Sequence, residues 1–428
     1  MKRVRCIKIV VWSLGAAAAT HAWAQTPPPP KILYGTTIPL LPANEFAIAT
    51  TVPTPQSPRA QYVVVAEANV DQDLEVLAWQ DTTSSLEKLS RHGIAEDEGV
   101  VSVAVTGLDA NRVVTADINK AGVLSIQTWN VGTGGVASQR VYRTAAATAS
   151  QDVSIATVSS SEVVTAYETT EGSLVVEAWT IGEGGLTAPM AVVGKGPNAF
   201  EASIAAIGPG QVITAAGDSN QGLWVNTWQI DSDGVKPLDQ VETQNALSLG
   251  CYGAPRPQTV AVAAGQSFEL LTSNASTPPY NFVQAAFTPV ITPNCNMQVY
   301  YWGISNAGVL TLQSTAPQIL GLSDQVAASM LSRNIPITTF DGGTGDNHIF
   351  VEQDVDQPLY ESSFVTYGDP YNVVNIASAT EGTDFSYLSL FEPYNAYFIS
   401  AGQFGAPSPN PYGTVFINVL SYPEAPIL

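Results

Sequence analysis

Residues 162–179, EVVTAYETTEGSLVVEAW, contain the pattern that decides the fold. β-branched and other apolar residues alternate with polar ones, a Gly-containing turn follows, and a second alternating run ends in Trp179. A period of two that is interrupted by such a turn is typical of a β-hairpin. The sequence therefore predicts two antiparallel strands in this segment.

Three other segments repeat the same hairpin. They read QYVVVAEANVDQDLEVLAW at 61–79, RVVTADINKAGVLSIQTW at 112–129 and QVITAAGDSNQGLWVNTW at 211–228. The terminal residues Trp79, Trp129, Trp179 and Trp228 are spaced by 50, 50 and 49 residues. A run of small residues precedes each hairpin, and a turn followed by a more polar strand comes after it.

Each unit of about 50 residues thus predicts four antiparallel strands, which is typical of a β-propeller blade. Small residues suit the innermost strand, where blades converge, and a large Trp suits the wider gap between blades. A β-sandwich or a β-helix explains neither the period nor this gradient in side-chain size. Further units open at Val260, Val326 and Val374. We therefore expect an all-β, seven-bladed β-propeller of four-stranded antiparallel blades.

The last two units can be aligned in two ways. His348–Asp354 is either the third strand of the sixth unit or its second. In the second alignment, Val415–Tyr422 lacks an outer partner, which the N-terminal Ile32–Thr37 would supply, closing the ring. The sequence leaves both alignments open.

The N-terminal residues 1–24 have the parts of a secretory signal peptide. Four basic residues between Lys2 and Lys8 precede a short apolar run, and Ala22-Trp23-Ala24 provides a cleavage signal. The apolar run is too short to span a bilayer. We expect cleavage after Ala24, a Pro-rich leader at 25–31, and a single propeller domain at 32–428 in a secreted or periplasmic protein.

The charge balance excludes some partners. The 428 residues include 16 Lys or Arg and 37 Asp or Glu, for a net charge of -21. Binding to nucleic acid requires clustered basic residues, and anionic membrane surfaces attract the same residues. We therefore expect neither nucleic acid nor a membrane as a partner.

The repeat segments of the form G-x-L-x-V-x-x-W, as at Gly172–Trp179, resemble repeats of secreted seven-bladed propellers of the lactonase-like and quinoprotein-like kinds. These families are known as 6-phosphogluconolactonase-type hydrolases and quinone-cofactor dehydrogenases. The resemblance covers residues 46 to about 310 and lies in the repeat pattern alone. It implies the fold and no specific family, since no catalytic motif of either family can be matched here residue by residue.

No catalytic motif can be identified in the sequence. A G-x-S-x-G elbow, an H-E-x-x-H helix, a P-loop and an EF-hand loop are all missing. Asp71-Gln-Asp73 and Asp231-Ser-Asp-Gly234 are interpreted as turns rather than calcium loops. The leading hypothesis is a non-enzymatic propeller that binds a ligand. A hydrolase or lyase acting on a carbohydrate or lactone, with carboxylates as acid and base, is the alternative, and a structural component of the cell surface is the third.

A ring of polar residues is predicted at the mouth of the central channel. These residues directly precede the seven innermost strands and are Glu45, Glu98, Asp152, Glu201, Gln258, Asp324 and Asn372. The five acids either brace turn amides or hold a cation, calcium or an amine-bearing ligand, because clustered carboxylates repel one another. The two interpretations are compatible, and calcium is the one cofactor that we consider.

An insertion in the fifth unit is expected on the same face. Cys251 and Cys295 are the two cysteines that remain after cleavage, and in an oxidising compartment they predict a disulfide around residues 251–295. The insertion contains Tyr252, Tyr280 and Phe282. With Trp224, which lies outside the repeated Trp position, they are the candidate contacts for a small molecule, a carbohydrate or a protein. The insertion could equally be decorative, and the repeated tryptophans are interpreted as core between blades.

Overall fold

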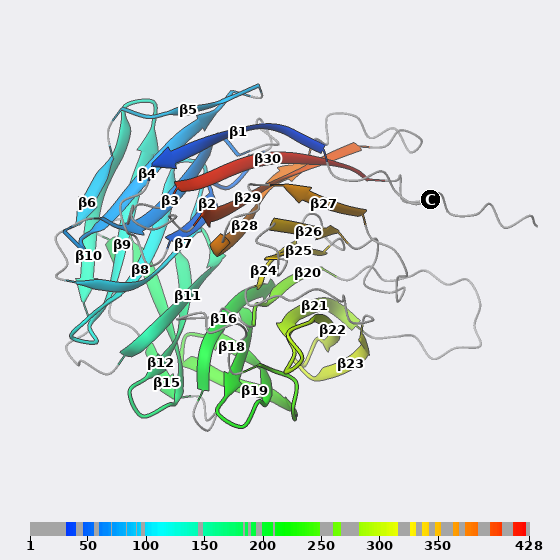
Figure 1. Cartoon of the computed structure of the whole chain (residues 1–428). Coiled ribbons are helices and arrows are strands. Elements are labelled where there is room, and N and C mark those ends of the chain that lie inside the picture. Colours follow the sequence, from blue (N-terminus) through cyan, green and yellow to red (C-terminus); the bar gives the residue numbers. More distant parts are fainter. Residues whose placement is uncertain are drawn as a thin grey trace, which may run out of the picture.

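The computed structural model of the chain describes residues 31–39, 46–54, 60–69, 71–82, 84–90, 92–95, 99–143, 149–182, 185–186, 190–193, 199–208, 210–248, 260–266, 282–315, 326–330, 336–341, 347–351, 363–367, 373–383, 394–404 and 414–424. These residues form β-strands and connecting turns without a helix (Figure 1). No helix capable of crossing a membrane occurs in the part of the chain that was searched. The sequence-based expectation of an all-β chain is confirmed.

The strands form seven antiparallel sheets within the described residues, and hairpin neighbours pair in chain order. The first strands are β2 (Phe46–Thr50), β7 (Val100–Gly107), β11 (Ala149–Ser159), β16 (Ala199–Gly208), β20 (Ala263–Gln266), β24 (Val326–Met330) and β28 (Val373–Thr383). The second strands are β3 (Tyr62–Ala68), β8 (Arg112–Asn119), β12 (Glu162–Thr169), β17 (Gln211–Asp218), β21 (Phe282–Ile291), β25 (Pro336–Asp341) and β29 (Tyr394–Phe404). We number the sheets 1 to 7 in this order.

The outer half of each sheet is more variable. The third strands are β4 (Leu74–Asp81), β9 (Leu124–Gly132), β13 (Leu174–Gly182), β18 (Leu223–Asp231), β22 (Met297–Ser305), β26 (Asn347–Val351) and β30 (Thr414–Glu424). The outer strands are β5 (Leu86–Lys88) with β6 (Gly93–Ala95), β10 (Gly135–Arg143), β14 (Gly185–Leu186) with β15 (Met190–Val193), β19 (Gly234–Thr243), β23 (Leu310–Thr315), β27 (Ser363–Tyr367) and β1 (Lys31–Pro39). Sheets 1 and 3 have five strands because their outer strand is split in two.

The two ends of the described chain share sheet 7. Strand β1 pairs antiparallel with β30, with Thr37 opposite Phe416, and Figure 1 shows the two strands side by side. Strand β26, which contains His348, is the third strand of sheet 6. The structure therefore combines the third-strand position of His348 with the N-terminal outer strand. The two features are compatible because the C-terminal segment supplies only β28, β29 and β30 to sheet 7, so β1 can be its fourth strand.

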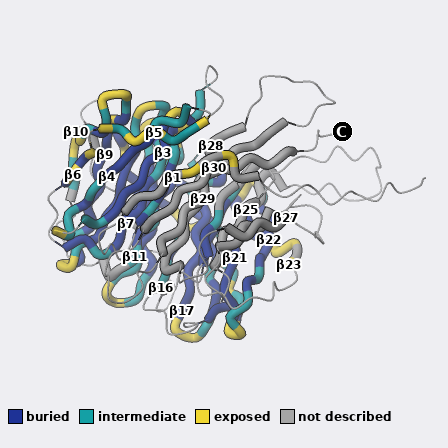
Figure 2. Tube along the Cα trace, turned by 45° about the horizontal axis from the view of Figure 1, so that its top comes forward, coloured by how far each residue is buried: buried dark blue, intermediate teal, exposed yellow. Residues whose placement is uncertain are grey.

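The core lies in the seams, by which we mean the interfaces between successive sheets. Figure 2 shows buried residues along the described strands of sheets 1 to 5. Trp179 of sheet 3 belongs to a buried cluster with Val114 and Ile126 of sheet 2, and Trp129 of sheet 2 packs in the same way on sheet 1. The five repeated tryptophans are at most 2% exposed. Their interpretation as core between blades is confirmed.

A hydrogen bond fixes four of these indole rings. In each case the Nε1–H donates to a threonine hydroxyl 14 residues earlier on the second strand, at 2.9 to 3.2 Å. The pairs are Trp129–Thr115, Trp179–Thr165, Trp228–Thr214 and Trp302–Thr288. Sheet 1 has Val65 at the corresponding position before Trp79. The buried N–H is thereby satisfied without water in sheets 2 to 5.

Serines in the small-residue runs join neighbouring first strands. The Ser102 hydroxyl accepts the Val153 N–H at 3.2 Å, Ser154 accepts that of Ile204 at 3.2 Å, and Ser203 accepts that of Val262 at 3.1 Å. The S-x-A pattern thus provides both a small side chain and a bond to the next sheet. Gly107 illustrates how close the sheets come, since a Cβ there would lie 2.2 Å from the Thr50 carbonyl oxygen.

Candidate functional site

One face of the molecule carries both the starts of the first strands and the turns between second and third strands, since successive strands run in opposite directions. We call it the mouth face. Its turns share one construction, in which an Asx or Thr side chain accepts N–H groups two or four residues later. Asn69, Asn119, Thr169, Asp218 and Thr292 fill this position. The turns are therefore rigid supports for whatever lies beside them.

Two of the predicted rim acids lie in described residues, Asp152 and Glu201. Both are half-buried and lie within the strands β11 and β16, which begin four and three residues earlier than expected, so these acids do not precede the strands. A register shift occurs at each of them, and Glu201 has a φ of 54°. A left-handed conformation is unfavourable for a residue other than Gly, Asn or Asp, so the bulge is held by its surroundings. Both residues take part in polar or electrostatic interactions.

The other rim acids Glu45, Glu98 and Asp324 lie outside the described residues, so the ring of five stays a prediction. Among the described residues, no group of three or more His, Cys, Asp or Glu side chains is placed to hold a metal ion. Tyr252, Tyr280 and Cys251 also lie outside the described residues, and Phe282 is described only by its backbone at the start of β21.

Trp224 lies at the mouth end of the seam between sheets 3 and 4. It lies on the same side of β18 as Trp228, which packs on sheet 3. Its side chain is half-buried rather than fully exposed. Its Nε1–H donates to Asp218 Oδ2 at 2.8 Å. The other carboxylate oxygen of Asp218 accepts the Asn220 and Gly222 N–H groups, both at 2.8 Å. The indole ring is thus fixed by a carboxylate that a turn already holds.

Cys295 occupies the left-handed position of its turn. Its φ is 59°, and Gly122 and Gly172 stand at the equivalent positions of sheets 2 and 3. The residue is disulfide-bonded. Because Cys251 is outside the described residues, the pairing of the two stays a prediction.

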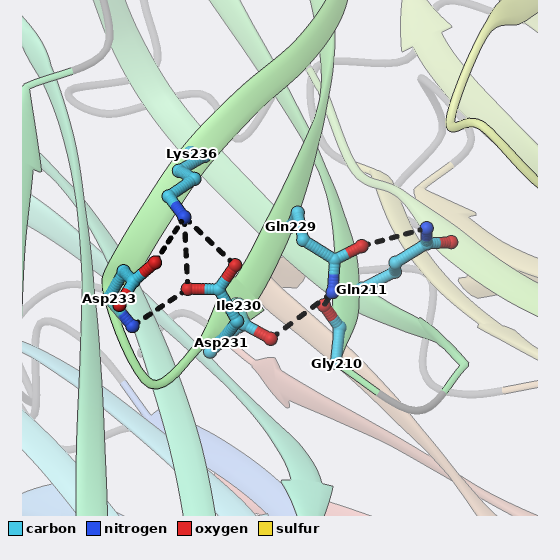
Figure 3. Close-up of polar contacts among 7 residues, drawn as sticks. All are labelled: Gly210, Gln211, Gln229, Ile230, Asp231, Asp233 and Lys236. Atoms are coloured by element: carbon cyan, nitrogen blue, oxygen red, sulfur yellow. Dashed lines mark hydrogen bonds and ion pairs between the residues drawn. The ribbon is translucent and has the colours of Figure 1, made fainter.

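The calcium-like segments are turns, as the sequence predicts. The Asp231 side chain accepts the Asp233 N–H at 2.8 Å, and Lys236 Nζ lies 3.0 Å from Asp231 Oδ2 and 3.1 Å from Asp233 Oδ2 (Figure 3). Hydrogen bonds from Lys236 and from the Asp233 amide lower the pKa of Asp231. The cation between these two acids is therefore a lysine of the same hairpin. Beside it, Gln229 Nε2–H donates to the Gly210 carbonyl at 2.9 Å (Figure 3).

A further acidic constellation was missed by the sequence analysis. Glu67 on β3 lies directly opposite Glu75 on β4, and His92 Nδ1 is 3.6 Å from Glu75 Oε1. Glu67 is 5% exposed, and its Oε2 atom has no hydrogen-bond partner. Burial and then the Glu75 charge raise the pKa of Glu67 to about 8, and Lys88 opposes this rise. The available signal was strand alternation, which places Glu67 and Glu75 on the same face as the buried Trp79.

Two neighbouring seams also contain buried acids. Asp117 is fully buried at the repeat position of Glu67. Glu177, 6% exposed, accepts a hydrogen bond from the Tyr167 hydroxyl at 3.1 Å, and its Oε2 is unpartnered. Burial raises the pKa of Glu177, and the Tyr167 bond opposes the rise. Glu67 differs from Glu177 in having a second carboxyl group opposite it.

A cavity of about 290 Å³ lies at the turn between β9 and β10. Its walls are Asn130–Gly132 and Gly134–Ala137. This turn follows a third strand and so belongs to the face opposite the mouth face. The lining contains no titratable side chain and offers little beyond backbone groups for recognition.

No protein-family profile matches the chain, and no curated protein matches its sequence. Solved structures that resemble it are β-propellers. The WD40 domain of Toxoplasma gondii coronin is 9% identical, over 92% of this chain and 88% of that one, with a TM-score of 0.49. An Aleuria aurantia lectin mutant solved with alpha-methyl-L-fucoside is 11% identical, over 78% and 96%, at 0.48. A Bacteroides fragilis protein provisionally described as a 6-phosphogluconolactonase is 12% identical, over 75% and 83%, at 0.47. These similarities concern the fold and identify no family.

Proposed function

We propose that the chain is one closed seven-bladed propeller that is exported and binds a ligand on its mouth face. Closure is supported by the first strands, each of which contacts the next around the molecule, with β28 contacting β2. The shared sheet of β1 and β30 joins the two ends in the same way. Export is supported by the N-terminal sequence 1–24, and the disulfide-bonded state of Cys295 supports an oxidising compartment and the pairing with Cys251.

One observation carries the binding proposal: an oriented aromatic and two rim acids occur at the mouth end of the same two sheets. Asp152 and Glu201 lie in the bulges just before the regular parts of the first strands in sheets 3 and 4. Trp224 lies on the same side of β18 as Trp228, which packs on sheet 3. An aromatic face provides apolar contact area, and carboxylates accept hydrogen bonds from hydroxyl groups. The ligand class that fits such a combination is a carbohydrate.

Binding of labelled protein to a panel of immobilised oligosaccharides tests this proposal. We expect the wild type to bind a subset of the panel and Trp224→Ala to lose at least about tenfold in affinity, the equivalent of one good contact. Leu312→Ala is the matched control, because Leu312 is 44% exposed on β23 of sheet 5. Unchanged binding by Trp224→Ala would refute the site, and a wild type that binds no saccharide would refute the ligand class.

The alternative is a hydrolase or lyase acting on a carbohydrate or lactone. The rim acids would act as acid and base. Within the described strands, Glu67 and Glu75 are the pair of acidic residues that lie directly opposite each other. A general acid must reach the leaving group by a direct contact or through one water molecule. Glu67 is too deeply buried for contact with a sugar, so the structure favours binding over hydrolysis at this pair. Release of 4-nitrophenol from 4-nitrophenyl glycosides, abolished in Glu75→Gln, would reverse this preference.

A further inference from the structure

Glu67 is a buried acid like Asp117 and Glu177, but it lies opposite a second carboxyl-bearing residue, Glu75. It is buried in the seam on the side of sheet 1 that also carries Trp79, and its Oε2 is without a hydrogen-bond partner. A buried polar group without a hydrogen-bond partner destabilises the folded state. A glutamine or leucine would avoid the charge at this position. The residue therefore deserves a functional explanation.

The surroundings of Glu67 are acidic and contain one lysine. Glu75 lies opposite on β4, and the half-exposed His92 lies beside Glu75. Lys88 Nζ lies 5.9 Å from the centre of the Trp79 ring, in a cation–π contact. Lys88 forms no ion pair with either carboxyl group among the described side chains. On the side of sheet 7, β28 contacts β2 and β1 contacts β5.

We infer that Glu67 and Glu75 form a binding site for a small primary ammonium group in the seam between sheets 1 and 7. Two facing carboxyl groups in a poorly solvated seam cannot both be ionised without a positive charge between them. Burial and the Glu75 charge raise the pKa of Glu67 to about 8, so Glu67 keeps a proton below that pH in the protein alone. A guest with both a charge and N–H donors would replace the proton and satisfy Oε2.

The geometry selects this ligand class over two others. A metal ion requires more oxygen or nitrogen ligands than these residues provide, and no metal-binding group is found among the residues that were searched. A sugar is too large for a group that is 5% exposed. A primary ammonium group is compact, and it carries both the charge and the N–H donors that two carboxyl groups can accept. The site is separate from Trp224 and independent of the proposed function.

The test is a titration of the full chain with methylammonium chloride, followed in a pH-stat without added buffer. At pH 6 to 7, binding should release up to one proton per bound cation, because the guest displaces the proton of Glu67. The methylammonium concentration at half-saturation should fall as the pH rises toward 8, because the proton on Glu67 then competes less with the guest. Methylammonium should also raise the melting temperature at pH 8, whereas sodium and tetramethylammonium at equal ionic strength should not, since neither donates a hydrogen bond.

Glu67→Gln is the decisive variant, and it should fold because Gln has the shape of the protonated acid. It should lose the proton release and weaken methylammonium binding by about ten- to a hundredfold, the value of a hydrogen bond to a charged group. Glu177→Gln is the matched control, since it removes an equally buried acid that lacks an opposing carboxyl group. Equal responses to methylammonium and sodium, or unchanged binding by Glu67→Gln, would overturn the inference. If Lys88→Met abolished the proton release, the released proton would come from Lys88 and not from Glu67, and the inference would be overturned.

Discussion

Sheets 1 and 3 are built from the same repeat but fill their seams differently. In sheet 3, Trp179 donates a hydrogen bond to Thr165, and the buried Glu177 accepts one from Tyr167. In sheet 1, Val65 replaces the threonine, and Glu67 faces a second acid instead of a tyrosine. Both acids have an unpartnered Oε2, but a tyrosine hydroxyl holds the acid of sheet 3, whereas the acid of sheet 1 faces a second carboxyl group.

The same contrast exists between two tryptophans of the outer half of the repeat. Trp179 is fully buried, whereas Trp224 is half-buried at the mouth face with its N–H held by Asp218. A feature that recurs in every unit serves packing, because every unit must pack in the same way. A polar or aromatic residue that occurs in one unit and not in the others has no such packing role, so we expect binding at such residues.

The largest expected effect separates the two tryptophans. Trp179→Ala should lower the free energy of unfolding by about 3 to 5 kcal/mol, because it leaves a cavity in the seam. It also leaves the Thr165 hydroxyl without its donor. Trp224→Ala should lower it by about 1 kcal/mol, since its ring is partly solvated. Urea unfolding followed by circular dichroism measures both, and equal losses would remove the distinction between packing and binding tryptophans.

The second prediction concerns the pH dependence that Glu67 imposes on sheet 1. Its pKa is raised from 4.5 to about 8, so the folded state binds more protons than the unfolded state between these values. The free energy of unfolding should therefore fall as the pH rises from about 4.5 to 8, by a few kcal/mol at about 1.4 kcal/mol per unit. Glu67→Gln should flatten this decline. A wild type that is more stable at pH 8 than at pH 5, with no change in Glu67→Gln, would contradict the seam environment.

The third prediction probes the hydrogen bond that sheet 1 lacks. Thr165→Val copies Val65 into sheet 3 and leaves the buried Trp179 N–H unpaired. The expected loss is about 1 to 3 kcal/mol. Thermal unfolding at fixed pH measures it, with Thr243→Val at the end of the half-exposed outer strand β19 as the control. A loss below about 0.5 kcal/mol would mean that the indole position is set by packing alone.

The smallest expected effect concerns the rim. If Glu45, Glu98, Asp152, Glu201 and Asp324 converge at the channel mouth, millimolar calcium should raise the melting temperature by a few degrees, and sodium at equal ionic strength by less. Changing Asp152 to Asn and Glu201 to Gln together should remove the calcium-specific part. Equal effects of the two salts, with destabilisation of the double variant, would make these acids braces of the strand starts.

Much of the fold could be predicted from the sequence because its signals are local. The hairpins around Trp79, Trp129, Trp179 and Trp228 lie where alternation and turn residues place them. The position of β1 beside β30 could only be offered as one option, because pairing between chain ends leaves no periodic trace. The starts of β11 and β16 were misplaced, since a bulge adds residues that do not alternate.

The site was less accessible to sequence reasoning. Trp224 was singled out because it breaks the repeat, but its bond to Asp218 depends on side-chain geometry. The alternating pattern of residues 61–79 does not distinguish Glu67 and Glu75 from the other strand residues. Their significance comes from burial in a seam, and burial of a polar residue depends on the sheet packed against it rather than on its own strand.

Hydrogen–deuterium exchange with and without the tightest-binding oligosaccharide of the panel tests the central claim most directly. The account predicts slower exchange at the mouth end of sheets 3 and 4, in the backbone around Asp152, Glu201 and the Asp218–Trp224 turn. Trp224→Ala should abolish this protection. Protection confined to the cavity at Asn130–Ala137 on the opposite face, or to no part of sheets 3 and 4, would contradict it.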